Sequence, residues 1–274
     1  MKKIFTIALA SLGLAACTTP AQKSAEEASS PKTLVVYYSQ TGATKKVAEE
    51  IKQQLNADIA EIVAENPYDG NFMETIERCK KEMETGETPN IKPLNINLEN
   101  YDMIFLGYPV WFGTYAPPVA GFIKENALEG KKIVTFCTFG SGGLQSSTDS
   151  LEKALPNCEI VEGYGVRNAR IDKASEEINR FLIEWGYKEG EIEALPAFME
   201  HRPVTEAEAA IFNQACGNYQ FRLGDPVDVA VRETAQSTDY EFTAKSPNEE
   251  TLSTIYVTVA KEGDTTPVFT QVIR

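Results

Sequence analysis

The first part of the chain alternates between short apolar runs and segments that have the period of a helix. Residues 33–38 form a β-branched and aromatic run without polar alternation, which predicts a strand buried on both faces. From Lys45 the period changes, because Val47 and Ile51 fall on one helical face. The same alternation continues through apolar runs at 58–63, 101–107, 131–137 and 159–165 and helical segments at 72–83, 116–125, 144–155 and 174–185. It predicts a five-stranded parallel sheet with helices on both faces.

The pattern changes after residues 189–203, a Glu-rich stretch that predicts a linker. Thr205 and Glu208 have the spacing of a capping box, which predicts a helix running to about Ala215. Strand-like runs separated by turn residues follow, at 226–234, 240–245, 254–260 and 267–273. This order predicts a small α+β domain over residues 204–274. It resembles the order of elements in cystatins, but the inhibitory Gln-x-Val-x-Gly segment is not kept, so the role of this domain stays open.

The beginning of the chain has the pattern of an export signal. Two lysines precede an apolar run at residues 4–14 that is too short to span a bilayer. Leu14-Ala-Ala-Cys17 closes the run and resembles a bacterial lipobox, in which the cysteine is lipidated; the alternative is a plain signal peptide with a chance cysteine. We therefore expect residues 1–17 to be a lipoprotein signal, residues 18–31 a flexible tether, and the protein to be exported and anchored by Cys17 on the periplasmic or cell-surface side of a membrane.

Three loops follow the predicted carboxyl ends of strands, where parallel sheets bind their ligands. The first combines hydroxyl groups with backbone N–H groups at a helix N-terminus, which predicts a phosphate site. Its candidate residues are Ser39, Gln40, Thr41, Gly42, Ala43 and Thr44. An ordinary capped helix is the alternative.

The second loop carries a tryptophan and the third is rich in glycine. Trp111 is expected in the middle of a loop, away from any strand or helix face, where it would stack on a flat ring; a tryptophan packed into the sheet edge is the alternative. Glycines in the third loop let N–H groups approach a ligand closely, unless this loop is simply a flexible turn. The candidate residues are Pro109, Val110, Trp111, Phe112 and Gly113 in the second loop, and Thr138, Phe139, Gly140, Ser141, Gly142 and Gly143 in the third.

Taken together, the three loops resemble those of the flavodoxin family. The resemblance rests on Val35-Val36-Tyr37 followed by Ser39, Gly42 and Thr44, on Gly-x-Pro-x-Trp ending at Trp111, and on Cys-Thr-x-Gly-Ser beginning at Cys137. It implies a short-chain flavodoxin-like fold with strand order 2-1-3-4-5 over residues 32–188. It also implies FMN as the cofactor, with the first loop on the phosphate, Trp111 stacked on one flavin face and the third loop near the ring edge. Tyr115 is a candidate contact to the ribityl chain.

These features predict a membrane-anchored electron-transfer protein that binds FMN and needs neither a catalytic side chain nor a metal. The formal net charge of −14 argues against nucleic acid as a partner and suits a redox partner protein with a basic surface. Two alternatives remain open. One is an NAD(P)H-dependent flavin or quinone reductase of the same fold, although no basic cluster for a 2′-phosphate is evident. The other is a non-redox interaction module that acts through its C-terminal domain.

Overall fold

The computed structural model describes residues 32–219, 223–245 and 252–273. The predicted export signal, the lipidation site Cys17 and the tether all lie outside the described residues. Within the described ranges, no helix combines the length and the apolar character needed to cross a bilayer.

The first sheet is parallel and has the order β2-β1-β3-β5-β6. Its strands are β1 (Thr33–Tyr37), β2 (Asp58–Glu61), β3 (Met103–Trp111), β5 (Lys132–Phe139) and β6 (Glu159–Arg167). The short β4 (Thr114–Tyr115) pairs antiparallel with the end of β3 and lies off this path. Counted among the parallel strands, the predicted order 2-1-3-4-5 is confirmed.

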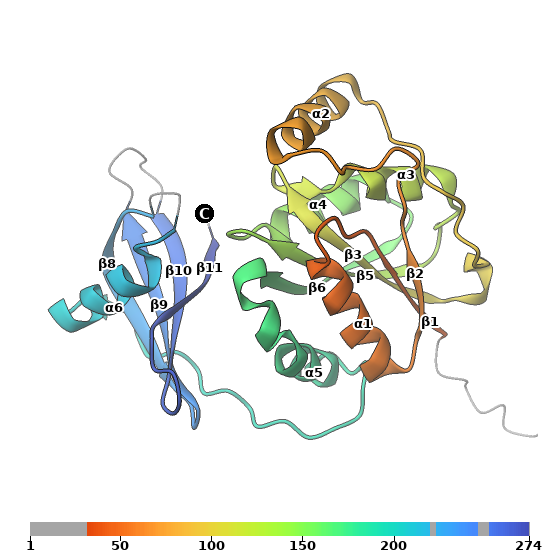
Figure 1. Ribbon diagram of the computed structural model, residues 1–274. Helices are drawn as coiled ribbons and strands as arrows, with labels where there is room; N and C mark the ends of the chain where they lie inside the picture. The colour runs from red at the N-terminus through yellow and green to blue at the C-terminus, as the bar shows by residue number, and fades with distance from the viewer. Residues whose placement is uncertain (1–31, 220–222, 246–251, 274) are drawn as a thin grey trace, which may run out of the picture. The chain divides into compact units, whose positions relative to one another are not determined.

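Two helices cover each face of this sheet (Figure 1). Helices α1 (Ala43–Leu55) and α5 (Ala174–Glu184) pack on one face, and α3 (Pro117–Glu125) and α4 (Leu144–Ala154) on the other. Side chains of β3 alternate between the two cores, so that Phe105 packs under α1 and α5 whereas Leu106 packs under α3 and α4. Short 3-10 helices at Leu98–Asn100 and Asn168–Lys173 precede β3 and α5. Burial on both faces explains why the inner strands β1, β3 and β5 are mostly apolar, whereas the outer strands β2 and β6 carry more polar residues.

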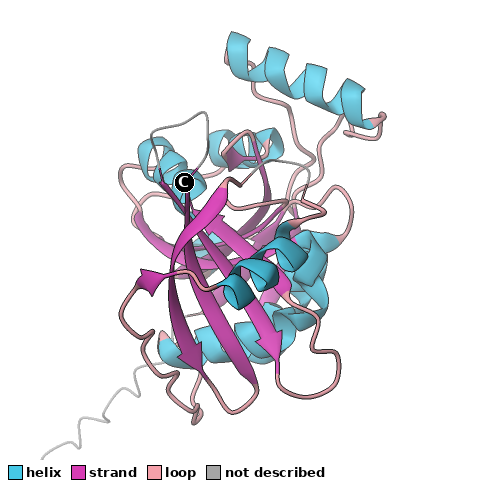
Figure 2. Cartoon of the chain, turned by 90° about the vertical axis from the view of Figure 1, so that its left-hand side faces the viewer, coloured by secondary structure: helices cyan, strands magenta, loops and turns pink. Residues whose placement is uncertain are grey.

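Helix α2 (Phe72–Thr85) packs near α3 instead of covering the sheet. In Figure 1 and in Figure 2 it stands clear of the parallel sheet, above its strands. Its N-terminus has a complete capping box made by Asn71 and Glu74, and Cys79 is its one buried residue. Its start agrees with the periodicity, although little apolar surface holds it in place.

The C-terminal part is a second sheet of order β11-β10-β9-β8-β7 with one helix packed on it. Its elements are β7 (Arg202–Pro203), α6 (Glu206–Cys216), β8 (Asp225–Glu233), β9 (Ser237–Lys245), β10 (Leu252–Ala260) and β11 (Val268–Ile273). Phe212 of α6 packs edge-on against Phe242, with ring centroids 5.2 Å apart. The predicted helix and antiparallel meander are confirmed, and the two-residue β7 was too short for the pattern to indicate.

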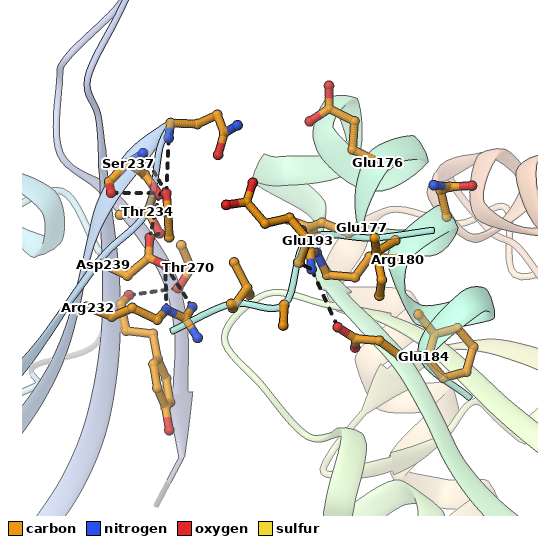
Figure 3. Close-up of a pocket in the computed structure, with 18 of the residues that line it drawn as sticks. Glu176, Glu177, Arg180, Glu184, Glu193, Arg232, Thr234, Ser237, Asp239 and Thr270 are labelled. Atoms are coloured by element: carbon orange, nitrogen blue, oxygen red, sulfur yellow. Dashed lines mark hydrogen bonds and ion pairs between the residues drawn. The ribbon is translucent and has the colours of Figure 1, made fainter. Parts of the chain in front are cut away.

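Two polar clusters hold this sheet together. In the first, Glu208 completes the predicted capping box with Thr205 and binds the guanidinium of Arg202 at 2.6 and 2.8 Å, which lowers the pKa of Glu208 to about 2. In the second, the Asp239 carboxylate accepts from Arg232 at 2.7 and 3.0 Å and from the Ser237 hydroxyl at 3.0 Å (Figure 3). Because these groups satisfy one another, both clusters are best explained as structural.

Candidate functional site

The strand register brings the three candidate loops to one edge of the parallel sheet. Tyr37, the last residue of β1, pairs with Gly107 of β3, and Pro109 of β3 pairs with Thr138 of β5. The segments that follow these positions therefore leave the sheet at the same edge. Since β1 pairs with β2 on one side and with β3 on the other, this edge is also the switch point at which parallel sheets bind ligands.

The first loop ends in an N-terminus of α1 that is suited to an anion. Gly42 is the N-cap, with φ 89°, and no side chain caps the helix. The Ser39 hydroxyl accepts the N–H of Gly42 at 3.2 Å, and the first turn of α1 holds no acidic residue. A helix leaves its first N–H groups without intrahelical acceptors, and the helix dipole favours negative charge there. The arrangement offers backbone donors, with Lys45 and Lys46 nearby, to a phosphate group.

Two of the six residues in the first loop bind other parts of the protein. The Thr44 side chain is buried, and its hydroxyl lies 2.9 Å from that of Thr138 in the third loop. Gln40 Nε2 donates to the Tyr68 carbonyl at 2.8 Å, beyond β2. Thr44 and Gln40 therefore join separate segments of the site, whereas Thr41 is exposed.

Trp111 does not lie in the middle of a loop, contrary to our expectation. Strand β3 continues through Pro109 to Trp111, which pairs with Thr114 of β4. The residues between them, Phe112 and Gly113, have φ values of 51° and 77°, the signs required by a type I′ hairpin turn. The strand was predicted to end at residue 107 because Gly107 and Pro109 interrupt the apolar run.

The hairpin holds two aromatic side chains in different ways. Trp111 is half-buried and meets Tyr38 and Tyr68 edge to face, with ring centroids 6.0 and 5.4 Å away. Phe112 is 51% exposed although its φ is positive, which is a strained conformation for a bulky residue. Strain of this kind is found preferentially at ligand sites. The hairpin thus places two aromatic rings beside the candidate loops: Trp111, which packs against two tyrosines, and Phe112, which is exposed.

Helix α4 ties the second loop to the third. The Ser146 hydroxyl donates to the Gly113 carbonyl at 2.7 Å. Gly143, with φ 119°, lies so close to Val110 that an added Cβ would be 2.7 Å from its Cγ1. The side chains of Thr138 and Phe139 are buried, and residues 140–143 lead from them to the N-terminus of α4. Gly140 is exposed and its carbonyl accepts from Arg167 Nε at 2.9 Å, whereas residues 141–143 are half-buried.

Tyr115, the candidate ribityl contact, lies on β4 and is half-buried, with its ring centroid 6.2 Å from that of Tyr108. Burial raises the pKa of Tyr115, which keeps its phenol protonated as a donor near neutral pH. Sequence reasoning missed Tyr38 and Tyr68, which contact Trp111. Tyr38 ends the first apolar run and Tyr68 lies in the polar segment after the second, so only the tertiary fold brings their rings to the hairpin. Donor-rich loops beside aromatic rings are suited to a flat ligand that carries a phosphate.

Comparison with known families matches residues 32–182, more than half of the 274-residue chain, to the family described as Flavodoxin. No curated protein matches the chain. Among solved structures, a candidate flavoprotein of Bacteroides eggerthii is 28% identical, with coverage of 55% of this chain and 99% of the other and a TM-score of 0.46. A flavoprotein of Lactobacillus acidophilus in complex with FMN is 26% identical, with coverage of 53% and 99% and a TM-score of 0.45.

Proposed function

The chain belongs to the flavodoxin family, and on that premise we propose that it is an FMN-binding electron-transfer protein held at a membrane by a lipidated cysteine. The observation that carries the redox part is the meeting of two donor-rich loops and an aromatic hairpin at one edge of the sheet, beside the N-terminus of α1, which no side chain caps. A carrier of this kind needs a site that binds and orients its cofactor, and no side chain has to serve as a catalytic acid or base.

We assign a separate part of the cofactor to each loop. The first loop binds the phosphate through the amides that open α1 and the Thr41 hydroxyl. The hairpin places Trp111 and Phe112 against the ring system, and residues 140–143 offer backbone N–H groups to its polar edge. When bound, FMN supplies the redox chemistry; the loops fix its orientation and keep water from part of its surface. The proposed contact residues are Ser39, Gln40, Thr41, Gly42, Ala43, Thr44, Pro109, Val110, Trp111, Phe112, Gly113, Thr138, Phe139, Gly140, Ser141, Gly142 and Gly143.

We expect NADH or NADPH alone to reduce the FMN-loaded protein very slowly. Hydride transfer requires a nicotinamide stacked on the flavin in near-attack geometry, and the net charge of −14 repels a polyanionic nucleotide. Anaerobic mixing in a stopped-flow instrument, with flavin absorbance as the signal, measures the rate. Bleaching at about 1 per second or faster would favour a reductase over a carrier. Failure of the purified chain to bind added FMN would contradict both.

The proposed anchor is tested independently of the flavin. Cells supplied with a fatty-acid probe are expected to label the wild-type protein and the Cys158→Ala variant equally, and to leave Cys17→Ala unlabelled. Cys158 is a suitable control because it is a free, partly exposed cysteine within the folded part of the chain. Equal labelling of wild type and Cys17→Ala would refute the anchor and leave the flavin site unaffected.

The partner that we propose is a redox protein with a basic surface, which the acidic chain would attract.

A further inference from the structure

The segment between β2 and α2 lies against the candidate cofactor loops, although neither the sequence nor the proposed function assigns it a role. We propose that Tyr68 of this segment is a positioning residue for Trp111 and for the phosphate loop, so that α2 and its preceding loop belong to the cofactor-binding structure. This inference rests on the proposed contact between Trp111 and the flavin.

Side chains of α2 hold Tyr68 in place from two directions. Its side chain is 5% exposed, and its hydroxyl donates to Glu82 of α2 at 2.5 Å. The Arg78 guanidinium lies 3.7 Å from the centroid of the Tyr68 ring, a cation–π contact. Arg78 also donates to Glu82 at 2.8 Å and to the carbonyls of Asn66 and Pro67 at 3.0 and 2.9 Å. Burial raises the pKa of Tyr68, which keeps the phenol protonated as the donor to Glu82.

The ring held in this way packs on the indole of Trp111. The centroids of Tyr68 and Trp111 are 5.4 Å apart with an angle of 62° between the planes, and Tyr38 adds a perpendicular contact at 6.0 Å. Edge-to-face pairs of this kind are favourable beyond the area that they bury. Because β3 fixes the backbone of Trp111 and two tyrosines occupy part of the surroundings of its ring, few orientations of the indole remain.

The backbone of Tyr68 also supports the phosphate loop. Its carbonyl accepts from Gln40 Nε2 at 2.8 Å, and Gln40 lies between the Ser39 hydroxyl and Thr41. The segment itself is tied to the chain ahead of β3, because the N–H of Glu65 donates to the Asn90 carbonyl at 3.0 Å. Tyr68 therefore contacts both Trp111, through its ring, and the first loop, through its carbonyl.

The other face of the sheet offers a matched control. Tyr164 is also buried, its hydroxyl donates to Glu177 at 2.7 Å, and Arg170 pairs with the same carboxylate at 2.5 Å. This second tyrosine–glutamate–arginine group packs with Phe181 in the core under α1 and α5. Removing its ring disturbs a core of similar chemistry without touching Trp111.

The test uses a Trp185→Phe background, which leaves Trp111 as the single tryptophan of the chain. We compare Tyr68→Leu, Tyr68→Phe and Tyr164→Leu by tryptophan emission and near-ultraviolet circular dichroism of the apoprotein, and by the Kd for FMN. We expect Tyr68→Leu to weaken the Trp111 dichroism, to shift its emission to the red, and to raise the Kd about fivefold or more. Tyr68→Phe keeps the ring and should stay within about twofold of the background, as should Tyr164→Leu.

The separate readouts keep the inference falsifiable. If Tyr68→Leu folds and leaves the Trp111 spectra and the Kd unchanged, or if Tyr164→Leu changes them equally, the positioning role is refuted. If Tyr68→Leu fails to fold, Arg78→Gln removes the cation over the ring and must weaken the dichroism and FMN binding, and an unchanged Arg78→Gln refutes the inference. Changed Trp111 spectra with an unchanged Kd would instead refute only the proposed contact between Trp111 and the flavin.

Discussion

Replacing Thr41 by aspartate is expected to raise the Kd for FMN about 100-fold while changing the Kd for riboflavin less than about threefold. Thr41 is exposed in the loop that leads into α1, where we place the phosphate. A carboxylate there repels the phosphate and cannot donate to it as a hydroxyl does. Two unit charges 4 Å apart interact by about 4 kcal/mol near a protein surface, and solvent screening reduces this toward the 2.7 kcal/mol of a 100-fold effect. Riboflavin lacks the phosphate and escapes the repulsion.

Thr41→Asn is the control because it has nearly the shape of aspartate but no charge and keeps a donor. It should cost much less FMN affinity than Thr41→Asp, measured by fluorescence quenching of the free flavins. The aspartate penalty should also shrink as salt is raised, since the loop is open to solvent. Equal losses for FMN and riboflavin would mean that the phosphate binds elsewhere.

Replacing Gly107 by alanine is expected to lower the free energy of unfolding by about 3 kcal/mol. Gly107 lies in β3 between β1 and β5, and an added Cβ would be 2.0 Å from Cζ of Phe136. Overpacking of this kind forces side chains out of their rotamers or displaces the backbone, because protein cores are close-packed. The strand that must shift is the one that continues to Trp111, so cofactor binding should weaken as well. Urea denaturation of the apoprotein measures the loss of stability.

A second substitution shows whether the steric clash is the cause. Phe136→Leu removes most of the ring that the new methyl group would meet, so the double variant should recover much of the stability lost by Gly107→Ala. The two residues are in contact, and their effects should therefore depart from additivity by about 1 kcal/mol or more. Additive losses would show that the effect of Gly107→Ala does not come from the contact with Phe136.

The order of the elements could be predicted well because burial on both faces makes the inner parallel strands β1, β3 and β5 short, mostly apolar runs. It failed at the end of β3, where Gly107 and Pro109 interrupt a run that the sheet nevertheless continues as far as Trp111. The turn that follows is Phe112-Gly113, which lacks the asparagine or aspartate that usually indicates a type I′ hairpin. Local composition therefore gave no signal for the two-residue β4.

The candidate site was predicted as a set of loops, but which side chains face a ligand depends on tertiary contacts. Thr44 was predicted as a contact to the phosphate, and the structure adds that its hydroxyl lies 2.9 Å from that of Thr138, 94 residues further along the chain. Gln40 bonds to the carbonyl of Tyr68, and that tyrosine reaches Trp111 from beyond β2. No periodicity records such long-range pairs, because each depends on a fold that several strands build together.

The sparse attachment of α2 has a consequence for how the molecule moves. A helix with a single buried residue gains little from packing, so it can unfold locally while the parallel sheet keeps its hydrogen bonds. Arg78 and Glu82, the residues that grip Tyr68, would leave with it. If Tyr68 positions Trp111 for the flavin, FMN binding and the folded, docked state of α2 stabilise each other. FMN then binds more tightly when α2 is docked, and α2 unfolds less often when FMN is bound. The thiol of Cys79 is 1% exposed, and burial raises its pKa to about 11. It can therefore react with a thiol reagent only while α2 is detached from the rest of the protein, so its rate of modification reports the local unfolding of α2.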